Sequence, residues 1–160
     1  MHESHIDATQ PKPVLYAQLV QELQGLIAGE PDFIANLANS AALIYHSLSD
    51  LNWAGFYLLK DGELVVGPFQ GKPACVRIAI GKGVCGAAAA QRTTQLVRNV
   101  HEFAGHIACD SASNSEIVVP MIRNGELLGV LDLDSPKLAR FDEQDREGLE
   151  KFVAALLAAT

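Results

Sequence analysis

The clearest indication of the fold lies in residues 115–134, SEIVVPMIRNGELLGVLDLD. Two runs rich in apolar residues flank Asn124-Gly125, and an Asn-Gly pair in that setting is the strongest short-range signal for a β-hairpin. The same pattern occurs upstream, where Asp61-Gly62 separates the apolar runs 52–60 and 63–69. The middle of the chain is therefore predicted to form an antiparallel sheet.

Both ends of the chain show helical spacing instead. Apolar residues recur at three- and four-residue intervals over 14–27 and again over 34–45, with Asp32 as the expected N-cap of the second helix. A C-terminal helix is expected to begin at Phe141-Asp142. Shorter elements are expected between the ends: a strand over 75–80, a helix over 84–92 and a strand over 95–98. This order predicts a single α+β domain, with N- and C-terminal helices on one face of the sheet and a ligand pocket under loops on the other.

Length and charge bound the function. The 160 residues suit one domain, with 1–12 interpreted as a flexible tail and 13–160 as the folded unit. A net charge of −7 without clustered Lys or Arg argues against nucleic acid. No run of about 18 apolar residues predicts a membrane span, and no secretory signal is evident. We therefore expect a cytoplasmic protein, in which thiols stay reduced and cysteines are either inert or redox-active.

The sequence has three cysteines, at 75, 85 and 109. Taken alone, Cys75 is best interpreted as a small buried hydrophobe. Cys85 stands at an expected helix N-terminus, where amide donors and the helix dipole favour thiolate. Cys109 lies in the longest irregular stretch, three residues after His106, whose imidazole could favour thiolate, although Asp110 would oppose it. Because no two cysteines are as close as in C-x₂-C, no metal site is expected.

Two carboxylates share one face of the last predicted strand. Asp132 and Asp134 are two residues apart, so both project from the face opposite Leu131 and Leu133. Adjacent like charges repel, and burial would raise a carboxyl pKa until one group keeps its proton. A solvent-facing edge of the sheet is an equally good interpretation.

Glu116 joins these acids in only one of two hairpin registers. A strict two-residue turn pairs Arg123 with Glu126 and turns Glu116 to the opposite face. A three-residue loop with a glycine bulge pairs Ile122 with Glu126 and sets Glu116 opposite Asp132. Both registers remain open from the sequence.

Trp53 and Tyr57 are four residues apart on a predicted strand and so share a face. Aromatic residues on strands usually belong to the core. If this face lines a pocket, the two rings could instead form the wall of a cage for a methyl group or a cation.

Several longer strings carry a family resemblance. They are GE (29–30), NLAN (36–39), NWAGFY (52–57), GPFQG (67–71), ACVRI (74–78), GKGVCG (81–86), GHIACD (105–110), SEIVVP (115–120) and LDLDS (131–135). Together they resemble the free methionine-R-sulfoxide reductase family, a group of GAF-domain enzymes. GAF domains at large share little of these strings, and the three cysteines stand within them.

The resemblance implies a GAF-like catalytic domain that reduces free L-methionine-R-sulfoxide. Cys109 would be the nucleophile that becomes a sulfenic acid, and Cys85 or Cys75 would condense with it to a disulfide that external thioredoxin reduces. Trp53 and Tyr57 would hold the methylsulfinyl end. Glu116, Asp132 and Asp134 would hold the ammonium, and Asp134 would also donate a proton or hydrogen bond to the sulfoxide oxygen. The family further implies a homodimer with no bound cofactor.

Two other functions fit parts of the pattern. A non-catalytic GAF module that senses a small ligand would explain the pocket but not three thiols. A general thiol peroxidase or redox sensor would explain a reactive cysteine. It would leave the acids without a role, because peroxide carries no positive charge.

Overall fold

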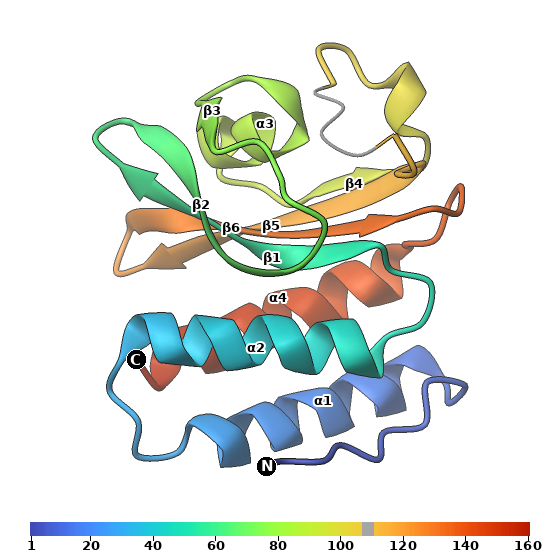
Figure 1. Cartoon of the computed structure of the whole chain (residues 1–160), viewed down its shortest axis with the longest axis vertical. Helices are drawn as coiled ribbons and strands as arrows, with labels where there is room; N and C mark the ends of the chain where they lie inside the picture. Colours follow the sequence, from blue (N-terminus) through green and yellow to red (C-terminus); the bar gives the residue numbers. More distant parts are fainter. Residues whose placement is uncertain (107–110) are drawn as a thin grey trace.

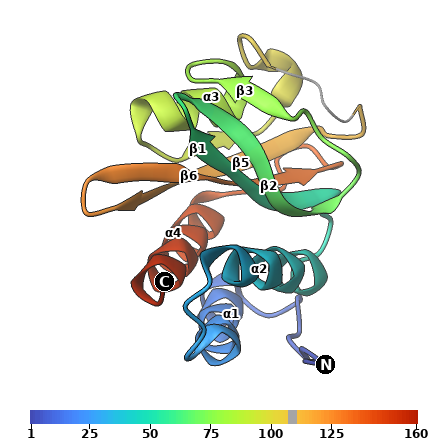
Figure 2. The ribbon, with the colours of Figure 1, turned by 60° about the vertical axis from the view of Figure 1, so that its left-hand side comes forward.

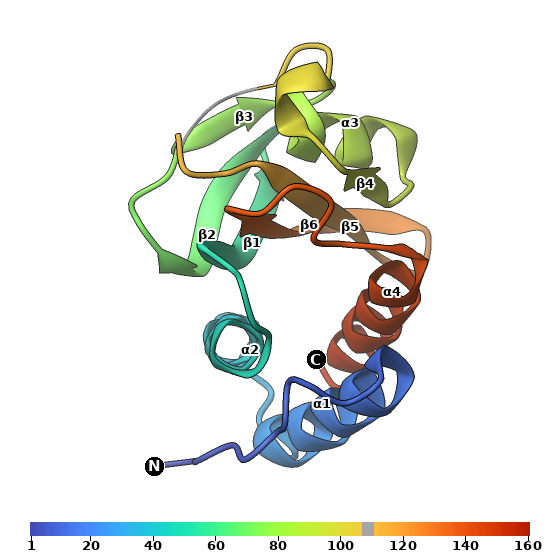
Figure 3. The ribbon, with the colours of Figure 1, turned by 90° about the vertical axis from the view of Figure 1, so that its right-hand side faces the viewer.

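The computed structural model describes residues 1–106 and 111–160. Three helices, α1 (Lys12–Ile27), α2 (Phe33–Ser47) and α4 (Glu143–Ala158), lie on one side of a six-stranded sheet (Figure 1). The short helix α3 (Gly83–Gln91) and a 3₁₀ turn, η1 (Val100–Glu102), lie on the opposite side (Figure 3). The α+β prediction is confirmed, with α3 as an addition to the face on which only loops were expected.

The sheet is antiparallel throughout, in the order β3-β2-β1-β6-β5-β4. Its strands are β1 (Trp53–Lys60), β2 (Glu63–Gly71), β3 (Arg77–Ala79), β4 (Gln95–Val97), β5 (Ser115–Arg123) and β6 (Glu126–Ser135). The two predicted hairpins are β1–β2 and β5–β6, and β6 lies beside β1 at the centre of the sheet. The hairpins therefore meet along β1 and β6, which carry the residues that matter most below.

Side-chain caps define where helices α2 and α4 begin. The Asp32 side chain accepts a hydrogen bond from the Ala35 amide at 2.8 Å, as expected of an N-cap. At α4, Asp142 and Asp145 form a capping box, each carboxylate accepting from the other residue's backbone amide. Each cap satisfies amides that the first helical turn leaves without partners.

Among the helices of residues 1–106 and 111–160, none has both the length and the hydrophobicity that a membrane span requires.

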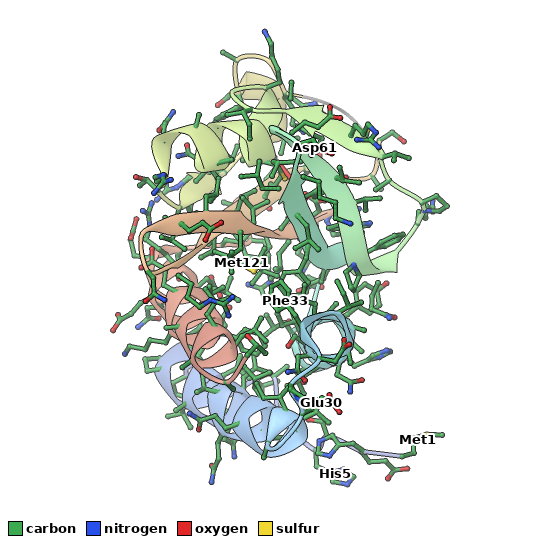
Figure 4. The ribbon with its side chains drawn as sticks, turned by 90° about the vertical axis from the view of Figure 1, so that its left-hand side faces the viewer. Met1, His5, Glu30, Phe33, Asp61 and Met121 are labelled. Atoms are coloured by element: carbon green, nitrogen blue, oxygen red, sulfur yellow. The ribbon has the colours of Figure 1, made fainter. Side chains whose placement is uncertain are left out.

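Two hydrophobic clusters sandwich the sheet. The larger lies between the sheet and α1, α2 and α4, where Met121 of β5 is fully buried (Figure 4). Strand alternation sends Phe56, Leu131 and Leu133 to this side. The smaller cluster lies on the α3 side and contains Trp53. Helix α1 packs against α2 and α4 and forms an outer layer (Figure 2), so the α3 side is the face left for a site.

Candidate functional site

A β-bulge sets the register of the β5–β6 hairpin. Arg123 pairs with Glu126 across a two-residue turn, but Met121 pairs with Gly129, which leaves one extra residue in β6. Beyond the bulge, Glu116 stands opposite Asp134. Neither predicted register is correct, because the turn is the strict two-residue type and the bulge lies farther along the strand. The bulge nevertheless returns Glu116 to the face of the two aspartates.

Gly129 makes this bulge possible. Its φ is +156°, a conformation that side-chain-bearing residues rarely adopt, and a Cβ there would lie 2.1 Å from the carbonyl oxygen of Tyr57. Because that neighbour is backbone of the paired strand β1, neither strand can yield without losing ladder hydrogen bonds. Only glycine therefore fits where β6 bulges against β1.

We expect Gly129→Ala to lower the free energy of unfolding by more than about 2 kcal/mol, since it adds both strain and a backbone clash. Urea unfolding at pH 7 measures the loss. Gly62→Ala is the matched control: Gly62 has φ +82° and no atom within 4 Å of an added Cβ, so only strain of roughly 1 kcal/mol applies. Equal losses in the two variants would contradict this account of the bulge.

The structure brings three acids and one thiol together under α3. One ligand atom each from Cys85, Glu116 and Asp132 lies within 4.8 Å of the others. All three residues are buried, at 4%, 7% and 5% exposure. Glu116 is hydrogen-bonded to both Asp132 and Asp134. The solvent-facing interpretation of these carboxylates is therefore wrong for Asp132, while Asp134 is half-buried.

Burial controls the protonation of the cluster. It raises the pKa of Glu116 well above the usual value, and the charges of Asp132 and Asp134 raise it further. Burial also raises the pKa of Asp132, to about 6, while hydrogen bonds from Glu116 and Cys85 oppose that rise. Both effects favour the protonated form of Glu116, whereas a pKa of about 6 leaves Asp132 mostly ionised at neutral pH. Oδ1 of Asp132 is buried and has no hydrogen-bond partner within the described part of the chain.

An aromatic wall faces the cluster. The rings of Trp53 and Tyr57 stack at 5.8 Å between centroids, and those of Trp53 and Phe69 stack at 5.1 Å. The indole Nε1 of Trp53 donates to the Lys72 carbonyl at 3.1 Å, and the Tyr57 hydroxyl donates to the Cys75 carbonyl at 2.9 Å. Burial raises the pKa of Tyr57, so its hydroxyl stays a neutral donor. The shared face predicted for Trp53 and Tyr57 is confirmed.

The cysteines differ sharply in state. Cys85 is a free, buried thiol, whereas Cys75 is disulfide-bonded and half-buried. Burial, followed by the charges of the neighbouring acids, raises the pKa of the Cys85 thiol well above its usual value. The thiolate expected at this helix N-terminus is therefore wrong, because the loss of solvent outweighs the helix dipole. Cys109, the expected nucleophile, lies outside the described residues.

One pocket joins these groups on the α3 side of the sheet. Its lining comprises Trp53, Tyr57, Lys72, Pro73, Ala74, Ile78, Lys82, Gly83, Val84, Cys85, His106, Ser113, Glu116, Asp132 and Asp134. Lys72 and Ser113 were not predicted to line a pocket. Each lies in an irregular segment, where the sequence has no periodicity from which its position could be inferred. Burial lowers the pKa of His106, with a smaller effect from His101, so its imidazole is mainly neutral at pH 7.

The thiol and two carboxyls could in principle hold a cation. Within residues 1–106 and 111–160, no other group of His, Cys, Asp and Glu side chains brings its ligand atoms so close. However, burial raises the pKa of Cys85 well above its usual value and also raises that of Glu116, so both shifts favour the protonated forms, and metal ligands must lose their protons. The arrangement is better suited to donating hydrogen bonds and a proton to a substrate whose positive group pairs with Asp132.

Known proteins resemble the chain closely. The GAF domain family model matches residues 32–160. The free methionine-R-sulfoxide reductase of Escherichia coli strain K12 is 54% identical over 145 residues, covering 91% of this chain and 88% of that protein. The Saccharomyces cerevisiae protein of the same name is 44% identical over 160 residues, covering 94% and 89%. A Neisseria meningitidis free methionine-R-sulfoxide reductase, solved in complex with its substrate, superposes with a TM-score of 0.94 at 43% identity, covering 99% and 95%.

Proposed function

The chain belongs to the free methionine-R-sulfoxide reductases of the GAF fold, and from that premise we propose that it reduces free L-methionine-R-sulfoxide by cysteine chemistry in the pocket under α3. The observation that carries the proposal is the buried acid cluster opposite the aromatic wall. A small molecule with an apolar sulfur-bearing end and a cationic end matches both sides of this pocket.

Each side of the pocket suits one end of the substrate. Trp53 and Tyr57 present stacked ring faces, which would hold the methylsulfinyl group by apolar contact. Asp132, whose buried Oδ1 has no hydrogen-bond partner among the described residues, would accept hydrogen bonds from the ammonium, supported by Asp134. A methionine sulfoxide within a polypeptide has no ammonium to offer, and it would leave that oxygen unsatisfied. The pocket should accordingly accept the free amino acid and reject the protein-bound one.

Protonated Glu116 would drive the first chemical step. The Cys109 thiolate would attack the sulfoxide sulfur while the oxygen takes a proton from Glu116, which is hydrogen-bonded to Asp134. The oxygen then resides on Cys109 as a sulfenic acid, and methionine leaves in its reduced form. The thiol of Cys75 would attack the sulfenic sulfur, releasing water and forming a disulfide. External thioredoxin would supply two electrons to restore both thiols, so no bound cofactor is needed.

The two resolving candidates are not equivalent. Cys75 is the one in a disulfide, and Cys85 is the one with a free, buried thiol. The Tyr57 hydroxyl also anchors the Cys75 backbone to the pocket wall. These features support Cys75 as the resolving residue.

The reaction is tested by following NADPH consumption with thioredoxin and thioredoxin reductase. We expect turnover of free L-methionine-R-sulfoxide, little with the S epimer, and slower turnover of hydrogen peroxide. Peroxide turnover that outpaces the R-sulfoxide would make the protein a thiol peroxidase. Substrate binding without any turnover would make it a ligand-sensing GAF module.

Replacement of the resolving thiol should separate chemistry from recycling. We expect Cys75→Ser to release roughly one methionine per chain in a burst and then to stop when thioredoxin is the only reductant. Rapid quench with amino-acid analysis measures the burst. The sulfenic acid should be trapped by dimedone in Cys75→Ser and much less in the parent protein. Steady multiple turnover by Cys75→Ser at the parent rate would contradict the assignment.

A further inference from the structure

Cys85 is a buried residue of the pocket lining. It lies in the first turn of α3, and α3 packs against β5 and β6, the strands that carry the acids. The preceding Gly83 has φ +61°, and an added Cβ on the following Gly86 would lie 2.6 Å from the Ala79 carbonyl oxygen. These two glycines let the first turn approach the neighbouring backbone closely, which fixes where the Cys85 side chain lies.

The Cys85 sulfur and a carboxylate oxygen of Asp132 lie within 4.8 Å of each other, and a hydrogen bond between the two side chains lowers the pKa of Asp132. A protonated thiol has one donor and the ionised carboxylate can only accept, so the S–H must donate. Glu116 donates to the same carboxylate from β5. Asp132 thus receives two donors from the protein, one from α3 and one from β5. Its Oδ1 is still without a partner among the residues described.

We infer that Cys85 is a positioning residue whose S–H donates to Asp132, holding that carboxylate ionised and oriented toward the substrate ammonium, and that it is not a redox thiol. The inference rests on the proposed function, because it assigns a role within the same pocket. A thiol that is buried, protonated and hydrogen-bonded to an anion is a poor nucleophile. The Cys85 thiol then acts electrostatically, through its effect on the Asp132 carboxylate.

Other groups also act on Asp132 and must be held constant in the test. The titratable or charged groups that face it are Tyr57 of β1, Glu116 of β5, Asp134 of β6, and Lys72, Lys82 and His106 on the pocket lining. A substitution at Cys85 leaves all of these side chains in the protein. Two substitutions there, one that removes the donor and one that restores it, therefore isolate the hydrogen bond.

The test compares Cys85→Ala with Cys85→Ser. Removing the donor should raise the pKa of Asp132, so the acidic limb of the kcat/KM profile should move to higher pH by about 0.5 to 1 pH unit in Cys85→Ala. Serine keeps a donor at the same position, so Cys85→Ser should return the limb toward that of the parent. Both variants should keep multiple turnover with thioredoxin, because the resolving thiol is Cys75.

A second readout does not require turnover. With ¹³C-labelled aspartate, NMR titration should give a higher pKa for the Asp132 carboxyl in Cys85→Ala than in Cys85→Ser, with Asp132→Asn assigning the signal. Equal carboxyl pKa values in the two variants would overturn the inference. So would a stop after one methionine per chain in both variants, which would make Cys85 the resolving thiol. If the parent protein itself fails to reduce methionine sulfoxide, the proposed function falls, and the titration still decides the hydrogen bond.

Discussion

Cys109→Ser should lose turnover of free L-methionine-R-sulfoxide by at least about 1,000-fold, because a serine hydroxyl cannot replace a thiolate as the nucleophile on sulfur. Rapid-quench measurement of methionine with one equivalent of substrate per chain tests the chemical step without any contribution from recycling. The expected result is no burst above background.

Binding should survive in the same variant. The chain has a single tryptophan, and Trp53 lines the pocket, so its fluorescence reports occupancy. The substrate Kd of Cys109→Ser, measured by fluorescence titration, should lie within severalfold of the Kd of the parent protein. The Kd of the parent protein is measured in single-turnover experiments. A full burst of methionine from Cys109→Ser would move the nucleophile to another cysteine. Loss of both turnover and the fluorescence change would instead indicate that the pocket has been disrupted.

Glu116→Gln should lower kcat by roughly 100- to 1,000-fold, because the amide keeps a hydrogen-bond donor but cannot transfer a proton to the departing oxygen. The parent protein should show a basic limb in its profile of kcat against pH, since the proposed mechanism uses protonated Glu116, whose pKa is raised by burial. The Gln variant should lack that limb. An unchanged profile in Glu116→Gln would assign the proton to another group, with Asp134 the first candidate.

The same substitution should stabilise the fold at alkaline pH. The folded-state pKa of Glu116 lies above its unfolded value, so its contribution is fully present below the unfolded pKa and is lost as the pH rises through the folded pKa. Gln has no proton to lose. The Tm of Glu116→Gln should therefore exceed that of the parent protein by an amount that grows as the pH rises above the usual carboxyl value of 4.5 toward the raised folded-state pKa. Thermal unfolding followed by circular dichroism measures the difference, and a constant offset across this range would contradict the assignment of the proton.

The sheet and its hairpins were predictable because they rest on local rules. Asn124-Gly125 and Asp61-Gly62 adopt the positive φ values that their turns require, and Asp32 caps α2 as expected. The register of β5–β6 was not predictable from the turn alone. The bulge lies inside the strand, and its one signal is Gly129, a glycine in an apolar run that permits several explanations.

The composition of the site was predictable in part for a similar reason. Alternation along a strand places Asp132 and Asp134 on one face, and Trp53 and Tyr57 on one face. Properties that depend on tertiary burial were not predicted. The pKa of Cys85 is raised because α3 packs onto the sheet and buries the thiol, whereas the helix dipole alone predicts a lowered pKa. Ser113 joins the pocket from an irregular segment that has no periodicity to follow.

Recognition of the substrate ammonium by the acid cluster is tested by the ratio of kcat/KM for free L-methionine-R-sulfoxide to that for its N-acetyl derivative. We expect a ratio above about 1,000, because the capped substrate would leave the buried Asp132 carboxylate without a cationic partner. Asp132→Asn should reduce the ratio, mainly by weakening activity on the free amino acid. Comparable kcat/KM values for the two substrates would contradict recognition of the ammonium by the acid cluster, while leaving the cysteine chemistry in place.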